Sequence, residues 1–250
     1  KWTDEAKKNL ERLKTKESGF KTNEQIFDEF IKAYQAKDEK RFWQIHLETK
    51  GIFTGVSIHQ QLTKKYLEAL KQNDERQADE YLTTLKKIGE MESEQHSDFF
   101  FKDLAEYYKT VENEQIDGNL QAKNLLDEGV KLVYQQKFTE SIEKFRQSEN
   151  KFSAVGNTTE SNIARFWVGE MLPDVNKLDE SRKILNEVIK KSENTRHKIL
   201  IPISYYWLSI NDFREGLFSK AIQNSQAGLN LAEEIENLYE ISHSSDLLVE

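Results

Sequence analysis

The sequence contains three short stretches that repeat at a constant interval of 40 residues: KFTESI at 137–142, KLDESR at 177–182 and LFSKAI at 217–222. Three small residues upstream of these stretches keep the same interval, and they are Gly129, Gly169 and Ser209. Three copies at one spacing are hard to obtain by chance. A fixed period of this length is typical of an array of stacked structural units.

The columns of the repeat predict how each unit folds. One column holds Thr139, Asp179 and Ser219, whose side chains can accept backbone N–H groups at a helix start, so we predict N-caps there. The bulky residue before each cap is expected to staple the turn to the helix. Those residues are Phe138, Leu178 and Phe218. A column of small residues suits a close crossing over the small residues of the preceding helix, and it holds Ser141, Ser181 and Ala221. Each unit is therefore expected to be a helix, a short turn and a second helix.

This pattern of small and large residues resembles the tetratricopeptide repeat. A small residue lies in the first helix, another follows twelve positions later, and a large apolar residue comes four further on. Phe145 and Leu185 occupy the large position, whereas Ser225 departs from the pattern. The family's unit has about 34 residues, so the longer period implies longer helices or longer loops between units, near Ser153–Thr159 and Glu193–His197. Pro173 is predicted to end a first helix early.

The resemblance implies an all-α fold, a right-handed superhelical solenoid of antiparallel helix pairs. The three copies span about residues 119–236, so residues 119–250 are expected to form three repeats of about 40 residues and a C-terminal helix. Residues 1–118 are helical in pattern but less regular. A degenerate repeat is expected near 58–92, with Asn73-Asp74 as its turn and Ala78 as its small residue. A further turn is predicted at Asp117-Gly118.

Composition and charge argue against several classes of function. The net charge is −8, so the surface would repel phosphate backbones and nucleic-acid binding is not expected. The chain has no cysteine, which removes disulfides and thiolate nucleophiles. No apolar run reaches the roughly 18 residues that a membrane span needs. The chain begins with Lys1, which indicates a fragment or a processed product, and the sequence does not specify a compartment.

Patterns of catalysis and metal binding are not found in the sequence. The histidines form no pair at ligand spacing on one helix. They are His46, His59, His96, His197 and His243. Carboxylates such as Glu92 and Glu94 are expected to be solvated on polar helix faces, and no glycine-rich phosphate loop or GxSxG elbow occurs. We therefore expect no enzyme activity, no metal and no cofactor. Some members of the aromatic clusters are expected to pack in the core with neighbouring leucines: Phe100, Leu104, Tyr205 and Leu208.

The resemblance also implies where a partner would bind, because the first helices of tetratricopeptide units line a concave groove. The matching positions of the first unit are Lys123, Leu126, Val130, Val133 and Tyr134. Those of the second unit are Ile163, Phe166, Glu170, Pro173 and Asp174. Those of the third unit are Pro202, Tyr206, Ile210, Phe213 and Arg214. Phe166, Tyr206 and Phe213 are expected to anchor a partner protein or peptide. The alternative is that another helix of the protein packs over this face.

The function that these patterns favour is a protein- or peptide-binding module without catalysis. The helical start around Phe27–Asp38, followed by a degenerate pair and 40-residue repeats, is similar to the N-terminal regions of bacterial proteins that join tetratricopeptide repeats to a caspase-like CHAT domain. This resemblance implies the regulatory arm of a larger bacterial multidomain protein, with any protease activity outside these residues because they include no cysteine. Two alternatives remain open. One is a stand-alone repeat regulator that binds a short signalling peptide, and the other is an all-α enzyme with a pocket between the N-terminal region and the repeats.

Overall fold

The computed structural model describes residues 22–50, 58–238 and 240–241, and all regular structure within those ranges is helical. The chain divides into two compact units, with the boundary between Ile45 and His46. The all-α class expected from the sequence is confirmed, and the helices pack in neighbouring pairs.

The first unit is built from α2 (Asn23–Gln35) and the N-terminal part of α3 (Glu39–Thr49). A capping box starts α2, because the side chains of Thr22 and Gln25 each accept the other's backbone N–H. Phe30 of α2 stacks on Phe42 of α3 with ring centroids 4.6 Å apart, and both rings are buried. This small apolar contact holds the hairpin closed.

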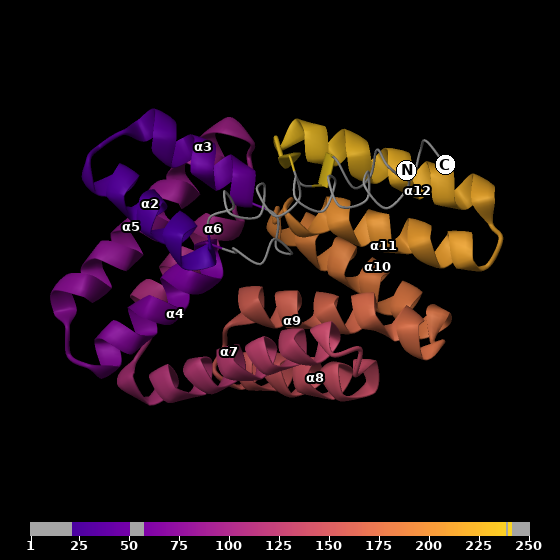
Figure 1. Cartoon of the computed structure of the whole chain (residues 1–250), viewed down its shortest axis with the longest axis horizontal. Helices are drawn as coiled ribbons and strands as arrows, with labels where there is room; N and C mark the ends of the chain where they lie inside the picture. The colour runs from indigo at the N-terminus through magenta and orange to yellow at the C-terminus, as the bar shows by residue number, and fades with distance from the viewer. Residues whose placement is uncertain (1–21, 51–57, 239, 242–250) are drawn as a thin grey trace, which may run out of the picture. The chain divides into compact units, whose positions relative to one another are not determined.

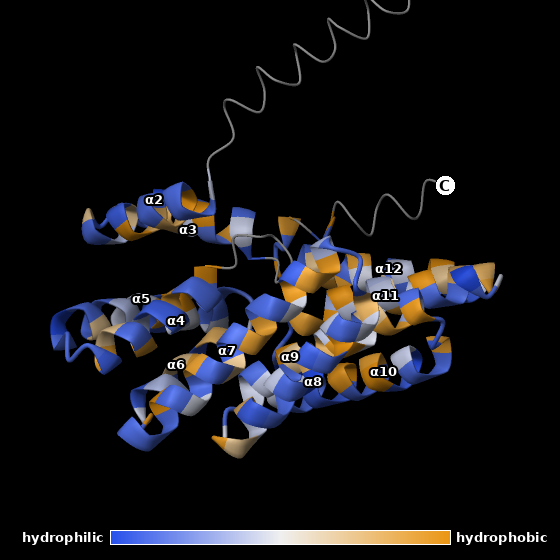
Figure 2. Cartoon of the chain, turned by 60° about the horizontal axis from the view of Figure 1, so that its bottom comes forward, coloured by the Kyte–Doolittle hydropathy of each residue, from blue (hydrophilic) through white to orange (hydrophobic). Residues whose placement is uncertain are grey.

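The second unit contains a longer series of antiparallel helices (Figure 1). In chain order its elements are α4 (Ile58–Lys71), α5 (Glu75–Gln95), α6 (Phe100–Lys109), α7 (Asn113–Tyr134), α8 (Phe138–Ala154), α9 (Thr158–Met171), the 3-10 helix η1 (Leu172–Val175), α10 (Leu178–Thr195), α11 (Leu200–Arg214) and α12 (Phe218–Glu234). From α7 to α12 each helix packs against the next one along the chain. Hydrophobic and hydrophilic residues alternate along most of these helices (Figure 2).

The turns between these helices recur with a regular spacing. A residue in the left-handed region lies at every twentieth position, at Gln136, Gly156, Asn176, Arg196, Gly216 and Glu236. In each turn the next backbone N–H reaches back into the preceding helix, as at Lys137 N to Leu132 O (2.9 Å) and Asn157 N to Phe152 O (2.9 Å). This is the bonding of a Schellman motif, which satisfies helix-terminal carbonyls within the turn. One repeat of 40 residues is therefore two helix-and-turn halves of 20.

The structure corrects the predicted helix starts. The predicted caps Thr139, Asp179 and Ser219 lie inside the first turns of α8, α10 and α12, so that prediction is wrong. The N-cap residues are Lys137, Lys177 and Leu217, and none makes a side-chain capping bond. The reason is that the left-handed residue already reverses the chain, so the next helix begins two residues after it.

The small residues allow close helix crossings, as predicted. Gly129 and Gly169 also pack against a large side chain of the following helix. A Cβ atom on Gly129 would lie 2.4 Å from the ring of Phe145, and one on Gly169 would lie 3.0 Å from Leu185. Ser181 adds a hydrogen bond from its Oγ to the Gly169 carbonyl oxygen (2.6 Å). The glycines thus make room for the large apolar residue of the following helix.

Longer helices, not longer loops, account for the long repeat, since α8 has 17 residues and α10 has 18 while the turns after them stay short. Pro173 ends a first helix, as expected, because α9 gives way to η1 at that point.

The N-terminal expectations had mixed outcomes. A hairpin of α4 and α5 spans the region of the degenerate repeat, with Asn73 in the left-handed region and Ala78 buried. The predicted turn at Asp117-Gly118 is wrong, because both residues lie inside α7, and so the expected boundary after residue 118 interrupts a helix. Gly118 instead lets Val155 approach, since a Cβ there would lie 2.5 Å from its side chain.

Candidate functional site

The predicted groove positions do not share one accessible surface. Seven of them are buried: Lys123, Leu126, Ile163, Phe166, Glu170, Pro173 and Pro202. Four are half-buried: Val130, Val133, Tyr206 and Ile210. The remaining four are exposed: Tyr134, Asp174, Phe213 and Arg214. Phe166, expected as an anchor, has no exposed surface and cannot contact a partner in this structure.

The burial has a physical cause, which is that helices from earlier in the chain pack against α7 and α9. Helix α4 packs against α7, and α6 packs against α9. Nearly every residue of α9 is buried, because α6, α8, α10 and α11 all pack against it, so this helix has almost no solvent-facing side. The alternative raised from the sequence, that another helix covers this face, therefore applies to the first two 40-residue repeats.

Most of the accessible positions lie in the last turn of a first helix, whereas Tyr206 lies in the middle of α11. We define the groove rim as Val130, Tyr134, Asp174, Tyr206, Ile210, Phe213 and Arg214. Tyr134 and Arg214 are the last residues of α7 and α11, and Asp174 occupies the matching place in η1. Arg214 donates to Asp174 over 2.9 Å, which shows that the ends of consecutive first helices lie side by side. Tyr134 is 78% exposed and Phe213 is 54% exposed.

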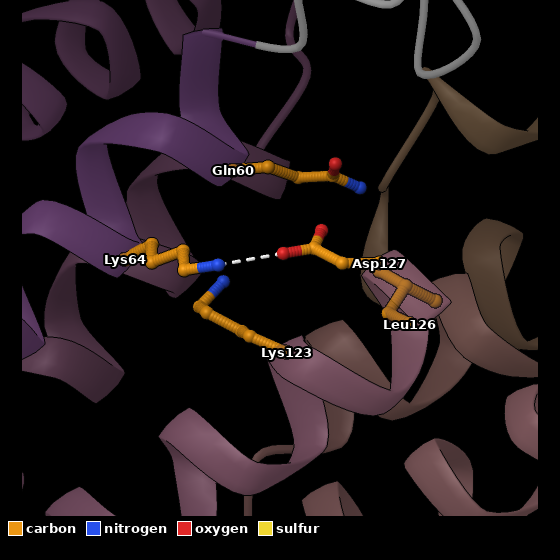
Figure 3. Close-up of a pocket in the computed structure, with 5 residues that line it drawn as sticks. All are labelled: Gln60, Lys64, Lys123, Leu126 and Asp127. Atoms are coloured by element: carbon orange, nitrogen blue, oxygen red, sulfur yellow. Dashed lines mark hydrogen bonds and ion pairs between the residues drawn. The ribbon is translucent and has the colours of Figure 1, made fainter. Parts of the chain in front are cut away.

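A small pocket lies between α4 and α7 (Figure 3). It is lined by Gln60, Lys64, Lys123, Leu126 and Asp127. Figure 3 shows Gln60 and Lys64 extending from α4 toward the side chains of α7, with Lys64 Nζ bonded to Asp127 Oδ2 at 2.6 Å. Its volume is about 10 Å³, which is room for one water molecule. The pocket cannot hold a metabolite.

Behind this pocket, Lys123 makes a buried ion pair with Glu160. The Lys123 Nζ lies 2.6 Å from Glu160 Oε1, and the Tyr108 hydroxyl donates to the same oxygen over 3.2 Å. Burial raises the pKa of Glu160, but the Lys123 ammonium outweighs this and holds the pKa below its usual range. Burial lowers the pKa of the neighbouring His59 to about 4, so that ring is neutral at pH 7. These groups form a bonded structural network rather than a reactive site.

A second buried network surrounds Glu92. Its carboxylate bonds His46 Nε2 at 2.6 Å, Lys50 Nζ at 2.7 Å and His96 Nδ1 at 2.8 Å. Lys50 Nζ also donates to the Ile235 carbonyl oxygen (2.7 Å), and so joins α5 to the end of α12. The prediction that Glu92 is solvated is wrong, because it is fully buried.

A sequence signal for the Glu92 network existed and was missed. Ile88, Glu92 and His96 follow one another at intervals of four, so they continue the apolar stripe of α5 on the same face. Within the ranges that the structure describes, no group of His, Asp and Glu side chains has the arrangement of a metal site. His243, the remaining histidine, lies outside those ranges. The core predictions for Phe100, Leu104 and Leu208 are confirmed, while Tyr205 is only half-buried.

Two further carboxyl groups are buried without partners. Glu170 is 7% exposed and Glu240 is 1% exposed. No hydrogen bond reaches Glu170 Oε2 or either carboxyl oxygen of Glu240. Burial raises the pKa of Glu240 to about 8. Burial raises the pKa of Glu170 well above its usual range, and the charges of Glu240 and Asp174 raise it further.

Comparison with protein-family models, with curated proteins and with solved structures gives no match for this chain. None of the described helices has both the length and the apolar character of a bilayer span.

Proposed function

We propose that this chain is a non-catalytic module that binds a protein segment or peptide along the groove rim, with α7–α12 acting as three repeats of the tetratricopeptide type. In this proposal the helix pairs form a right-handed superhelix. Support comes from the 40-residue period and from the turn that recurs every 20 residues. Such arrays commonly bind partners along an extended concave surface.

The observation that carries the proposal is the exposure of large side chains at the rim. Tyr134 and Phe213 each leave more than half of their surface in water, although a buried position would be favourable for both. Rigid aromatic groups of this kind supply much of the binding energy of protein interfaces. The Arg214–Asp174 pair beside Phe213 adds charges that can orient a bound chain.

A polypeptide fits these features better than a small molecule does. Small ligands need enclosed pockets of several hundred Å³. The pocket of Figure 3 is smaller by more than an order of magnitude, and its charged groups already bond one another. An extended segment instead can contact exposed side chains of α7, η1 and α11 without a deep cavity.

A regulatory role extends the proposal. A segment bound across the rim would contact the ends of several first helices at once, and so would favour one arrangement of the units over others. An effector domain attached to such a module would respond to that change, as the resemblance to CHAT-linked repeat regions implies. Slower amide hydrogen exchange in α7, α9 and α11 on peptide binding is the expected result.

The test selects ligands from a random peptide library displayed on phage against the purified chain, and measures the affinities of selected peptides by calorimetry. The double variant Tyr134→Ala/Phe213→Ala removes both rim aromatics and should weaken binding by ~2 kcal/mol or more. Ile222→Ala is the matched control, because Ile222 is 57% exposed on α12 and lies outside the rim. Failure to select any peptide, or equal binding by the rim variant, would refute the proposal.

A further inference from the structure

The start of α11 lacks the cap that the repeat places elsewhere. The residue after the left-handed turn residue is Asn157 before α9 and Asn237 at the end of the third unit, but His197 before α11. Each asparagine side chain accepts a backbone N–H, at 3.1 Å from Glu160 N and 3.2 Å from Glu240 N. Helix α9 begins directly after its asparagine, whereas α11 begins three residues after His197 and has no side-chain cap of its own. The turn that leads into α11 therefore has backbone N–H groups that need another acceptor.

Asp98, at the corner between α5 and α6, supplies that acceptor from 100 residues earlier in the chain. Its Oδ1 accepts the Lys198 N–H at 3.2 Å, and its Oδ2 accepts the Ile199 N–H at 3.0 Å. Its Oδ1 also accepts the N–H of Phe100, the first residue of α6, at 3.0 Å. Asp98 is completely buried. One carboxylate thus joins the starts of two helices, and the N-terminal end of each helix favours negative charge.

Other polar groups join the same corner to the turn before α11. Phe99 N donates to the Arg196 carbonyl oxygen at 3.0 Å, and the Arg196 guanidinium lies 3.7 Å from the centre of the Phe99 ring. His197 Nε2 and Asp103 Oδ2 are 2.9 Å apart. Water can replace hydrogen bonds of this kind, so each one contributes only modestly to holding the corner against the turn.

The first apolar side chains of α6 pack on helices that come earlier in the chain. The Phe101 ring lies 5.1 Å from the ring of His46 in α3, and the Phe100 ring lies 5.4 Å from the ring of His59 in α4. Phe100 also contacts the His197 ring across the polar junction, at 5.6 Å. The corner can therefore keep apolar contacts with α3 and α4 when its polar bonds to the turn before α11 are broken.

We propose that the α5–α6 corner is a releasable latch on the repeats, in which Asp98 and the polar groups beside it bind and release the start of α11 together. After release, α11 would keep its packing on α10 and α12, while its first N–H groups would lose their acceptor. The opposite end of α11 carries Phe213 and Arg214 of the groove rim. A partner at the rim and the latch would act on the same helix, which couples the two sites. That coupling rests on the proposed function, whereas the latch itself does not.

Amide hydrogen exchange, measured by NMR on the whole protein at pH 7.5, tests the latch. Burial and the charge of Glu92 raise the pKa of Asp98 to about 6, so its carboxyl group is ionised at this pH. The informative amide is Phe99 N–H, because its bond to the Arg196 carbonyl does not involve the Asp98 side chain. In the Asp98→Ala variant this amide should exchange at least about tenfold faster, since the whole corner is released.

The opposite result is specific. If only the N–H groups bonded to Asp98 exchange faster, and Phe99 N–H keeps its rate, then Asp98 is a helix cap and the latch is overturned. Asp98→Asn keeps the shape of the side chain and one acceptor oxygen, so it should give a smaller increase at Phe99 N–H. This milder variant decides the question where Asp98→Ala does not fold, and an unchanged Phe99 rate in it would overturn the latch equally.

Two further variants separate the latch from general fraying. Asp74→Ala is the matched control, because Asp74 caps α5 within its own helix, accepting from Gln77 N at 3.0 Å, and its loss should leave Phe99 N–H unchanged. His197→Asn gives α11 the asparagine cap of the other units. In Asp98→Ala/His197→Asn the start of α11 should regain slow exchange while Phe99 N–H stays fast. Return of Phe99 N–H to its original rate would overturn the latch, because fraying of α11 would then explain the release.

The peptides selected against the rim keep the two proposals distinguishable. A rim peptide should change the exchange rate of Phe99 N–H in the unchanged protein, and Asp98→Ala should change the affinity of that peptide by the same coupling. Release of Phe99 N–H by Asp98→Ala in a protein that selects no peptide supports the latch and contradicts the binding module. Peptide binding at the rim, with Phe99 N–H unaffected by Asp98→Ala, contradicts the latch and leaves the binding module intact.

Discussion

Replacing Gly129 with alanine tests the helix crossing on which the repeat depends. A Cβ atom at this position would lie 2.4 to 2.9 Å from three atoms of the Phe145 ring, whereas carbon atoms in contact are ~3.5–4 Å apart. The ring would have to move by about 1 Å. It has little freedom to do so, because Phe145 is fully buried and stacks on Trp167 with centroids 5.2 Å apart.

The expected magnitude follows from two opposing effects. Overpacking of a rigid core costs ~1–3 kcal/mol, and a ring displaced by this amount lies at the upper end. Alanine in place of glycine favours the helix by ~1 kcal/mol. The Gly129→Ala variant should therefore lose about 2 kcal/mol of unfolding free energy. Gly169→Ala is the matched control, because its nearest atom belongs to the flexible Leu185 at 3.0 Å and the two effects should nearly cancel.

Urea unfolding followed by circular dichroism and by tryptophan fluorescence measures both variants. Adding Phe145→Leu to Gly129→Ala should restore part of the loss, so the two changes together should cost less than the sum of each alone. A Gly129→Ala protein as stable as the unchanged chain would show that Phe145 does not pack over Gly129. Strictly additive costs would lead to the same conclusion and would remove the proposed crossing.

Three further predictions concern the buried charges. Because burial raises the pKa of Glu240 to about 8 in the folded state, the folded protein should lose stability as pH rises from about 4.5 to 8. The Glu240→Gln variant should remove this pH dependence and be more stable than the unchanged protein at pH 9, by on the order of 3 kcal/mol in urea unfolding. An unchanged pH dependence of stability in the variant would contradict this prediction. The Lys50→Met variant removes the buried cation beside Glu92 and should lower the free energy of unfolding by ~3–5 kcal/mol. The Lys64→Met variant removes one partner of a partly exposed ion pair and should lower it by only ~0–1 kcal/mol. Equal losses of stability in thermal unfolding would refute this difference. Burial lowers the pKa of His59 to about 4, so the neutral ring contributes stability above pH 6.5 that is lost as pH falls toward 4. If a His59→Gln protein loses stability at low pH in the same way as the unchanged protein, His59 is not the cause of that loss.

The parts of the fold that were predictable are those written locally in the sequence. The 40-residue period, the early end of α9 at Pro173 and the burial of Phe145 and Leu185 all follow from neighbouring residues and helix geometry. The helix caps were predicted wrongly because the turn before each helix is not recognisable from its residue types. A left-handed residue such as Gln136 has no distinctive side chain, so the turn that starts α8 gives little signal in the sequence.

The candidate site was less predictable, because its burial depends on helices that are distant in sequence. Lys123 and Glu160 are charged residues of the types that usually lie on solvated helix faces. Only the packing of α4 and α6 places them inside. Glu92 is similar, since its cation at Lys50 lies 42 residues away. Periodicity reports which side of a helix is apolar, but it does not report which helix from another part of the chain covers that side.

The regular turn spacing limits how the length of this chain can change. Each turn uses backbone bonds at fixed offsets from its left-handed residue, as at Lys137 N to Leu132 O and Lys177 N to Leu172 O. Insertion of a few residues would break those bonds and rotate every later helix out of its packing. Duplication of one whole 40-residue unit would instead bring its own two turns and its own crossing glycine. The array can therefore lengthen only in whole units, each of which adds one more helix end to the surface.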